Sequence, residues 1–403
     1  MMTGIADAHP TGQPREKSDP DPYPNYAWMR EHAPVSPVFS PYAAGTTWLV
    51  TSYDLVRASL ADTRLSNDDR NSSAPPAPFG SGEWDPARGL LDLDRPEHAR
   101  LRRLVAGAFS PGAVERMRGM VQRIADEAID SFAGSGAVDL VSSFSLPVPV
   151  GIIHEVLGVP ASEREAPARC LDLFYRAGMT QPIDVPALTA LVDYVKRLAD
   201  YKRVNPGDDV AAHLIRGFES GDLRDENELH SMILSVLGAG HVTTVQFLGC
   251  AVLRLLQHPD QLAAVREGRV SWAAVVNEVL RYDSPVQASA YRYASEDLEI
   301  GGVPIAKGDS VLISLAAANR DPERFEQPDE FRADRDARGN VAFGHGTHLC
   351  LGAQLARLEG EVALETLFRR LPDLSLDVRP DDVVWAYGPM LRGPRRLPVT
   401  FSC

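Results

Sequence analysis

The chain has 403 residues, of which 44% are hydrophobic and 24% charged, a composition typical of a globular protein with a large buried core. Its 41 lysine and arginine residues against 55 aspartate and glutamate residues give a formal net charge of −14. That charge argues against a nucleic-acid binder or an anionic-membrane binder, because both rely on cationic contacts to phosphate.

Cys170, Cys250, Cys350 and Cys403 lie far apart, without the paired spacing of a zinc site or the density of a disulfide framework. No run of 18 or more apolar residues is present, and residues 1–24 are polar and proline-rich rather than signal-like. We therefore expect a cytoplasmic protein that uses no membrane and no nucleic acid, with a flexible segment over residues 1–24.

The first hundred residues mix element types. The pattern predicts a short helix near 26–32, a hairpin over 38–50, and a helix with Thr51 or Ser52 as its N-cap. Residues 67–82 are rich in Ser, Pro, Gly and Asn and form one long loop, which is either disordered or functional.

Beyond this loop the pattern is helical for most of the next 180 residues. Pro96 and the pair Ser110-Pro111 each mark the start of a helix. A longer helix is predicted over about 226–258, between the capping residue Asp225 and Pro259, and it would be roughly 50 Å long. Its middle is apolar on nearly every face, which is typical of a helix buried through a large core.

Two features interrupt this long apolar helix. Gly238-Ala-Gly240 lacks side chains at two positions, and the hydroxyls of Thr243-Thr244 compete for backbone carbonyls. A bend or widened turn is expected there, although two helices meeting at a glycine fit the same pattern. After Pro285 the chain turns to short strands, including 298–305, and then to a helix over 353–370. The fold class is therefore mainly α with small β-sheets (α+β).

The most specific motif is Phe343-Gly-His-Gly-Thr-His-Leu-Cys-Leu-Gly352. Its glycines allow turns that are closed to other residues, and Cys350 stands immediately before a helix. Helical N–H groups and the helix dipole stabilise a thiolate at such a position, as a metal ligand requires. A single soft ligand does not suit a tetrahedral zinc site. An isolated cysteine in a glycine-rich turn is by default buried and inert.

At every fixed position this segment matches F-G-x-G-x-[HR]-x-C-x-G of the cytochromes P-450, the haem-thiolate monooxygenases, and the chain resembles their bacterial soluble members. Other segments resemble the family's landmarks in the expected order: the haem-facing helix (95–103), the bent oxygen-binding segment (239–244), the E-x-x-R helix (278–281), and the stretch before the cysteine loop (319–322 and 331–335). The E-x-x-R pattern alone is weak, since such charges usually form a solvated pair.

The resemblance implies the cytochrome P-450 fold, with a long central helix crossing over the haem and a cysteine loop before a C-terminal helix. A single catalytic domain would then occupy residues 25–403, with no fused reductase. Haem b is the implied cofactor. Cys350 would be the axial ligand of its iron and favour O–O cleavage.

Further haem contacts follow from the same resemblance. Burying the two haem propionates requires cationic or donor partners. Taken singly, each such residue reads as an ordinary surface histidine or arginine. The matching positions for the propionates are His98, Arg102, Arg292 and His348, and the other implied cofactor contacts are Phe343, Gly344, Ala239 and Gly240. Glu278 and Arg281, with Arg335, would form a buried ion-pair network with a structural role.

Thr243 matches the threonine that the family uses to hold oxygen and deliver protons. One residue earlier, relatives usually carry an acid, and this chain has Val242, which cannot relay a proton. His241 lies about 100° away around the helix and is not taken as a substitute. Water can perform the relay instead, with Val242 as plain apolar packing, or the reaction departs from ordinary hydroxylation.

By family analogy, a largely apolar pocket implies a sizeable hydrophobic substrate. Its walls would include the loop 66–91 and the helix pair around 170–190, joined at 178–182 by a lid hinge or an ordinary helix stop. The individual pocket candidates are Val236, Ala239, Val286, Ala288 and Met390.

The expected function is O2-dependent hydroxylation or epoxidation of a polyketide, terpenoid or peptide in secondary metabolism. The alternatives are non-hydroxylating oxidation, such as aryl coupling, ring formation or desaturation, and a non-catalytic haem protein that only binds a ligand. Electrons from NAD(P)H would arrive through a ferredoxin reductase and a ferredoxin, the latter docking near Arg103 and Arg357 of a monomer.

Overall fold

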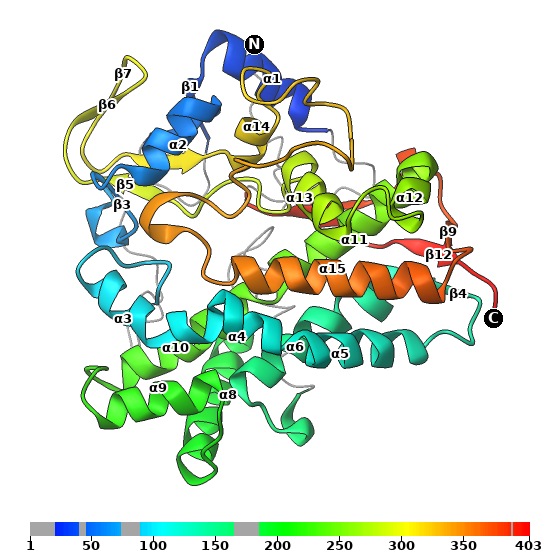
Figure 1. Cartoon of the computed structure of the whole chain (residues 1–403). Coiled ribbons are helices and arrows are strands. Elements are labelled where there is room, and N and C mark those ends of the chain that lie inside the picture. Colours follow the sequence, from blue (N-terminus) through cyan, green and yellow to red (C-terminus); the bar gives the residue numbers. More distant parts are fainter. Residues whose placement is uncertain (1–20, 40–45, 74–88, 165–184, 388–389) are drawn as a thin grey trace.

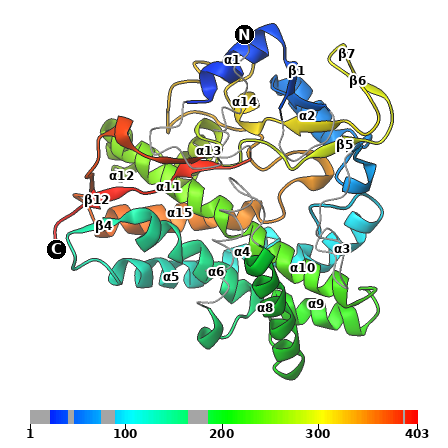
Figure 2. The ribbon, with the colours of Figure 1, turned by 180° about the vertical axis from the view of Figure 1, so that it is seen from behind.

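The computed structural model describes residues 21–39, 46–73, 89–164, 185–387 and 390–403. It is mostly helical with small sheets, which confirms the predicted fold class (Figure 1). Most strands of the largest sheet gather with the short helices at one side of the molecule, and the longer helices fill the rest. Figure 2 shows the same division from behind.

The described chain begins with helix α1 (Tyr23–His32). The prediction of a flexible segment is therefore wrong for its last two residues, Tyr23 and Pro24, while residues 1–20 lie outside the described part. Tyr23 is buried, and its hydroxyl donates to the carbonyl of Asp283 at 2.7 Å. No local sequence pattern predicts that contact, because the two residues are 260 positions apart.

A hairpin is present as predicted, but its first strand ends at Val38, where the predicted hairpin begins. Strand β1 (Val35–Val38) pairs antiparallel with β2 (Thr47–Val50), and their connection at 40–45 lies outside the described residues. Of the loop predicted at 67–82, residues 67–73 are described and contain the short helical turn η1 (Asp69–Asn71).

Helix α2 (Tyr53–Ala61) has Ser52 at its N-cap position, as predicted, but the Ser52 side chain makes no capping hydrogen bond. The carboxylate of Asp321 accepts from the N–H of Tyr53 instead, at 2.8 Å. The segment that precedes the cysteine loop therefore caps this helix and fixes the two against each other.

Within the described residues, short strands form four small sheets. The largest has the order β1-β2-β8-β5-β3, in which β2 and β8 are parallel and the other pairs antiparallel. The others are β4-β12-β9, β6-β7 and β10-β11, all antiparallel. The remaining bounds are β3 (Leu65–Ser66), β4 (Ala137–Asp139), β5 (Arg292–Ala294), β6 (Leu298–Ile300), β7 (Val303–Ile305), β8 (Ser310–Ile313), β9 (Ser375–Leu376), β10 (Trp385–Tyr387), β11 (Arg392–Pro394) and β12 (Pro398–Thr400).

The helices enclose the main core. Buried apolar side chains of α5, α6, α11, α13 and α15 form one continuous cluster, with α15 packed between α5 and α13. Helix α15 (Ala353–Arg370) has the predicted bounds. The other helices are α3 (Glu97–Ala106), α4 (Pro111–Arg116), α5 (Arg118–Asp130), α6 (Pro147–Leu157), α8 (Val185–Val204), α9 (Val210–Glu219), α10 (Glu226–Ala239), α11 (Val242–Gln257), α12 (Pro259–Arg266), α13 (Trp272–Tyr282) and α14 (Leu315–Asn319).

The long apolar helix is two helices that meet at a break. Asp225 caps α10 by accepting from the N–H of Glu228 at 2.9 Å, and the helix ends at Ala239. Helix α11 begins two residues after Gly240, and His241 departs from helical geometry with φ −97° and ψ −79°. The sequence predicted an interruption at this position. Of the two possibilities, a bent helix or two helices that meet at a glycine, the structure has the second. As one run, 226–257 is long and apolar enough to cross a membrane, yet 72% of its most apolar stretch is buried in this core.

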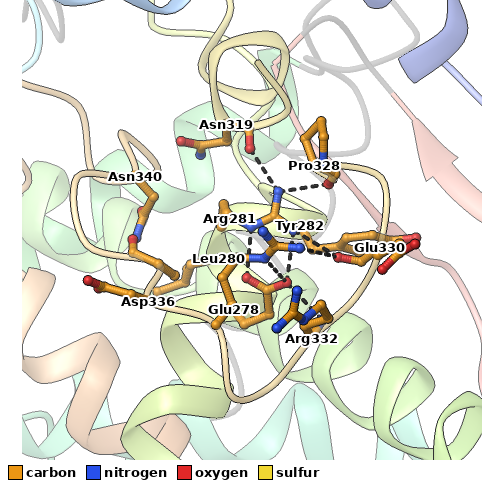
Figure 3. A network of polar contacts seen from close by, with 12 residues as sticks. Glu278, Leu280, Arg281, Tyr282, Asn319, Pro328, Glu330, Arg332, Asp336 and Asn340 are labelled. Atoms are coloured by element: carbon orange, nitrogen blue, oxygen red, sulfur yellow. Dashed lines mark hydrogen bonds and ion pairs between the residues drawn. The ribbon is translucent and has the colours of Figure 1, made fainter. Parts of the chain in front are cut away.

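A buried ion pair fixes α13 to the segment that leads to the cysteine loop (Figure 3). Arg281 donates to both carboxylate oxygens of Glu278, at 2.7 and 2.8 Å, and both side chains are fully buried. The same guanidinium donates to the carbonyls of Asn319 and Pro328.

The Glu278 carboxylate has further donors from the segment after Pro328. Its Oε1 accepts from the backbone N–H of Arg332 at 2.9 Å and from Nε of Arg335 at 3.2 Å. Asn319, next to this network, accepts from the N–H of Val341 at 2.7 Å. Because every charge has partners, the network can hold the irregular chain from 319 to 341 in one conformation.

Replacing the carboxylate should unfold the protein more easily. In Glu278→Gln, the buried Arg281 loses its counter-charge, and we expect a loss of about 3–5 kcal/mol in the free energy of unfolding, measured by urea denaturation. The matched control is Asp336→Asn, which breaks the exposed pair between Asp336 and Arg338 and should lose far less. Equal losses in the two variants would contradict the structural role of the network.

Candidate functional site

The cysteine loop is shaped by glycines in the left-handed region. Gly344 has φ +74° and Gly346 has φ +76°, conformations that L side chains rarely adopt. A Cβ on Gly346 would also lie 2.9 Å from the carbonyl oxygen of Leu60, at the end of α2. A hydrogen bond closes the loop around both glycines, because the N–H of Cys350 donates to the carbonyl of Phe343 at 2.8 Å. These constraints place the cysteine directly ahead of α15.

Protein surrounds much of the Cys350 thiol while leaving the residue accessible, and these surroundings are called the recess below. Its residue is solvent-accessible, yet burial by the surrounding protein raises the pKa of the thiol. The backbone N–H of Gly352, the N-cap of α15, and the charges of Arg102 and Arg357 act in the opposite direction. The thiolate therefore has donors on the protein side and an open side, where a metal ion would stabilise it further.

Four basic side chains gather near this recess from three elements. His98 and Arg102 come from α3, Arg292 from β5, and His348 from the short turn η7 (Gly346–His348). The rings of His98 and His348 have centroids 4.1 Å apart. Arg102 donates to the carbonyl of Leu349 at 2.7 Å, which ties α3 to the cysteine loop.

The electrostatics of this basic cluster are unbalanced. Burial, followed by the charge of Arg292, lowers the pKa of His348 to about 3. Burial also lowers the pKa of Arg292 to about 10, and the pKa of His98 is lowered by burial and by Arg102. Within the part of the chain that the structure describes, the buried Nε of Arg292 has no hydrogen-bond partner. Asp94 is the anion that already acts on Arg292 and His98. A group with two carboxylates would supply the missing acceptor and further negative charge, so the cluster fits haem propionates.

The break between α10 and α11 presents an opening within an otherwise buried element. Ala239 is exposed although most of its neighbours along the helix are buried, and Thr243 is partly exposed. The Thr243 hydroxyl donates to the carbonyl of Ala239 at 3.0 Å. Exposure in the middle of a core helix indicates that these two residues face a hollow. Gly240 differs, because the direction of its missing side chain is filled by Ile153 of α6, 2.7 Å from an ideal Cβ.

The two residues before Thr243 point into the protein. Val242 is buried. Its side chain is apolar and cannot supply a proton. His241 is buried as well and interacts electrostatically with His154 of α6, whose pKa burial lowers to about 4. The structure thus keeps His241 toward α6, in line with the expectation that it does not replace the acid.

The predicted pocket residues have different exposures. Val236 and Ala288 are buried, and Val286 is half-buried. Met390 is an exposed apolar side chain beside this segment, since its carbonyl accepts from the N–H of Gln287 at 2.8 Å. Of the loop 66–91, residues 74–88 lie outside the described part, and so do residues 165–184 of the predicted helix pair, including Cys170 and the hinge at 178–182.

The two predicted ferredoxin contacts differ in exposure and stay predictions, and the sequence missed Asn277 and Glu359. Arg103 is exposed on α3, but Arg357 is half-buried, with its guanidinium 4.5 Å from the ring centroid of Phe343. Asn277 accepts from Arg357 at 3.4 Å, and nothing in the sequence singled it out. Glu359 is buried on α15, burial raises its pKa well above the ordinary value, and its Oε2 lacks a partner among the described residues. In the charged run of 357–361 it looks like part of a solvated face.

Comparison with known proteins agrees with this geometry. Residues 272–382 match the family model described as Cytochrome P450. The chain is 42% identical over 386 residues to the cytochrome P450 monooxygenase PikC of Streptomyces venezuelae, covering 94% of this chain and 91% of PikC. It is 40% identical to the 6-deoxyerythronolide B hydroxylase of Saccharopolyspora erythraea, covering 94% and 96% of the two chains.

Solved structures agree as well. The tirandamycin C-bound P450 monooxygenase TamI superimposes with a TM-score of 0.87 at 36% identity, covering 95% of this chain and 98% of TamI. Together with the cysteine loop, these likenesses show that the chain belongs to the cytochrome P450 family and is a haem-dependent monooxygenase that receives electrons from an external donor.

Proposed function

We propose that Cys350 binds the iron of haem b and that this enzyme hydroxylates or epoxidises a sizeable apolar natural product of secondary metabolism. The observation that carries the proposal is the accessible Cys350 thiol at the N-terminus of α15, next to a basic cluster in which the buried Nε of Arg292 has no acceptor among the described residues. When bound, haem supplies an iron centre at which O2 is activated.

The residues that would hold the haem come from both sides of the recess. His98, Arg102, Arg292 and His348 would donate to the propionates, and burial of Arg292 makes that contact a strong one. Phe343, Gly344 and Ala239 would pack against the macrocycle. Gly240 lies close to Ile153 of α6, so no larger side chain fits there without a shift of Ile153.

Proton transfer in this enzyme would depend on Thr243. Its hydroxyl donates to the Ala239 carbonyl, so it must rotate to donate toward a reacting group in the hollow. Val242 offers no proton to replace the one that Thr243 gives up. Water within the hollow would then complete the relay.

A relative named for polyketide biosynthesis supports a polyketide-type substrate. The chain is 35% identical over 370 residues to the polyketide biosynthesis cytochrome P450 PksS of Bacillus subtilis, covering 88% of this chain and 89% of PksS. The candidate pocket residues are apolar, so hydrophobic surface of the substrate would be buried there. Terpenoid and peptide substrates remain the alternatives.

Electrons would come from NAD(P)H through a ferredoxin reductase and a ferredoxin. The exposed Arg103 on α3 is a candidate contact for an acidic ferredoxin, since charge complementarity steers such encounters. We place the enzyme in the cytoplasm as a monomer.

A second candidate is non-hydroxylating oxidation at the same haem. The missing acid at Val242 favours it, and the chain is 34% identical to CxnD, described as an enzyme for C–S bond formation, with a TM-score of 0.85. A haem protein that only binds a ligand is disfavoured, because the named relatives are monooxygenases and hydroxylases.

A spectral screen of natural-product scaffolds tests the proposal. Binding should displace water from the ferric haem, and the binding compound should stimulate O2 consumption when ferredoxin, reductase and NADPH are supplied. Product analysis then separates hydroxylation from ring formation, coupling or desaturation. Binding without any substrate-dependent O2 consumption would overturn the assignment of this chain as the catalyst.

Restoring an acid next to Thr243 should improve proton delivery. In Val242→Glu, we expect a larger share of consumed reductant to appear as product rather than as hydrogen peroxide, because a carboxylic acid can donate where valine cannot. Val242→Gln is the matched control, with a similar shape and no transferable proton. If both variants bind substrate normally and convert the same share of consumed reductant into product, the absence of an acid at position 242 does not limit the reaction.

Removing one cation from the basic cluster should weaken haem binding. Arg292→Gln loses a charge-assisted hydrogen bond, so we expect haem transfer to apomyoglobin to become about tenfold faster or more. Arg64→Gln, which alters an exposed arginine paired with Asp62, serves as the control. Haem transfer at the wild-type rate in Arg292→Gln would contradict the propionate assignment.

A further inference from the structure

Ser235 lies on the accessible side of α10. Most residues of this helix are buried, whereas Ser235 is half-buried and Ala239, one turn further along, is exposed. Thr243 follows after another four residues, beyond the break, and is partly exposed as well. Residues four apart share one side of a helix, so Ser235 extends by one turn the hollow that Ala239 and Thr243 face.

The spacing between Ser235 and Thr243 sets a length along this hollow. The two residues are eight positions apart in the sequence, which corresponds to roughly 12 Å along a helix axis. Thr243 is the residue on which proton transfer was proposed to depend. A substrate group held at Ser235 is therefore separated by about two helical turns from the reacting end of the same molecule.

The Ser235 hydroxyl can accept a further hydrogen bond. A serine hydroxyl has one donor and two acceptor lone pairs. The donor is used within α10, since Oγ donates to the carbonyl of Ser231 at 2.7 Å. Among the described residues, none donates a hydrogen bond to this oxygen. Next to an apolar hollow, such an oxygen offers a partner to an O–H or N–H group of a bound molecule.

The backbone of Gly89 packs against this hydroxyl. A Cβ on Gly89 would lie 2.2 Å from Oγ of Ser235, so a larger residue fits only if the hydroxyl moves. Gly89 is itself held in a turn, because the N–H of Asp92 donates to its carbonyl at 3.2 Å. Asn67 fixes the same turn by donating to the carbonyl of Leu91 at 2.8 Å. Gly89 therefore restricts the orientation of the Ser235 hydroxyl.

We infer that Ser235 determines specificity by accepting a hydrogen bond from an O–H or N–H group of the substrate, roughly 12 Å from the carbon that is oxidised. The inference deepens the proposed function and rests on it. It narrows the substrate class to apolar molecules that carry a hydroxyl, amine or amide N–H at that separation. A molecule without such a donor should bind less tightly, because it leaves the Ser235 oxygen unpaired.

Probes anchored at the haem test the inference in the holoenzyme. The probes are N-alkylimidazoles of increasing chain length that end in a hydroxyl group. Each is compared with its methyl ether, which keeps the acceptor oxygen and loses the donor. Binding of the imidazole to the ferric iron shifts the Soret band, so spectral titration gives the dissociation constants. At the chain length that reaches Ser235, the alcohol should bind about tenfold more tightly than the ether.

Variants separate the hydrogen bond from packing. Ser235→Ala should abolish the preference for the alcohol, and Gly89→Ala should reduce it, because the added Cβ displaces the hydroxyl. In the double variant Gly89→Ala, Ser235→Ala, the nearest neighbours of the new Cβ lie at an ordinary 3.6 Å. That variant should fold normally and still show no preference.

The matched control is Ser220→Ala at the exposed end of α9. The Ser220 hydroxyl likewise donates to a carbonyl of its own helix, that of Gly217 at 3.1 Å, and its loss should leave the preference unchanged.

Three results would overturn the inference. They are equal affinities of alcohol and ether at every chain length in the wild type, a preference that persists in Ser235→Ala, and a preference lost equally in Ser220→Ala. Failure of the proposed function shows separately, because the imidazole probes would then produce no shift of the Soret band in the wild type.

Discussion

A thiolate at the mouth of a protein recess is stable only if charge or hydrogen-bond donors compensate for its lost water, and the structure around Cys350 meets that requirement from one side. Burial raises the pKa of the thiol, and the N–H of Gly352, with Arg102 and Arg357, opposes that rise. The open side receives no compensation from the described residues. The proposed iron would complete it, and this single bond would determine where the haem lies.

Contacts elsewhere in the fold hold the cysteine loop in place. The buried pair of Glu278 and Arg281 anchors the irregular chain that leads to the cysteine loop, and the carboxylate of Asp321 in the same chain caps α2. Gly346 then packs against the end of α2. At the break near His241, Ala239 and Thr243 are accessible while the helices before and after the break remain in the core. The packing around the cysteine loop and the break between α10 and α11 would together shape the site of the proposed haem.

Local patterns predicted the elements whose causes are local. Helix α15 has the predicted bounds because its apolar periodicity is local to it, and Asp225 caps α10 as its position indicated. The cysteine loop was a specific motif because three glycines and one cysteine stand at fixed spacing within ten residues. The interruption of the long helix followed from Gly240 and the neighbouring threonines.

Contacts between distant parts of the chain could not be predicted in this way. The hydroxyl of Tyr23 bonds to a carbonyl 260 residues away, so the start of α1 fell inside a segment expected to be flexible. The partner that caps α2 comes from position 321 rather than from Ser52. Arg357 looked like a surface charge because its ring partner, Phe343, and its amide partner, Asn277, meet it only in the folded chain.

The most direct test of the central claim is the absorption spectrum of the purified, haem-loaded protein after reduction under carbon monoxide. Ligation by the Cys350 thiolate predicts the strongly red-shifted Soret band of a thiolate-bound carbonyl complex, retained at neutral pH. A colourless protein after haem supplementation, or a carbonyl complex that absorbs like a histidine-ligated globin, would contradict the account.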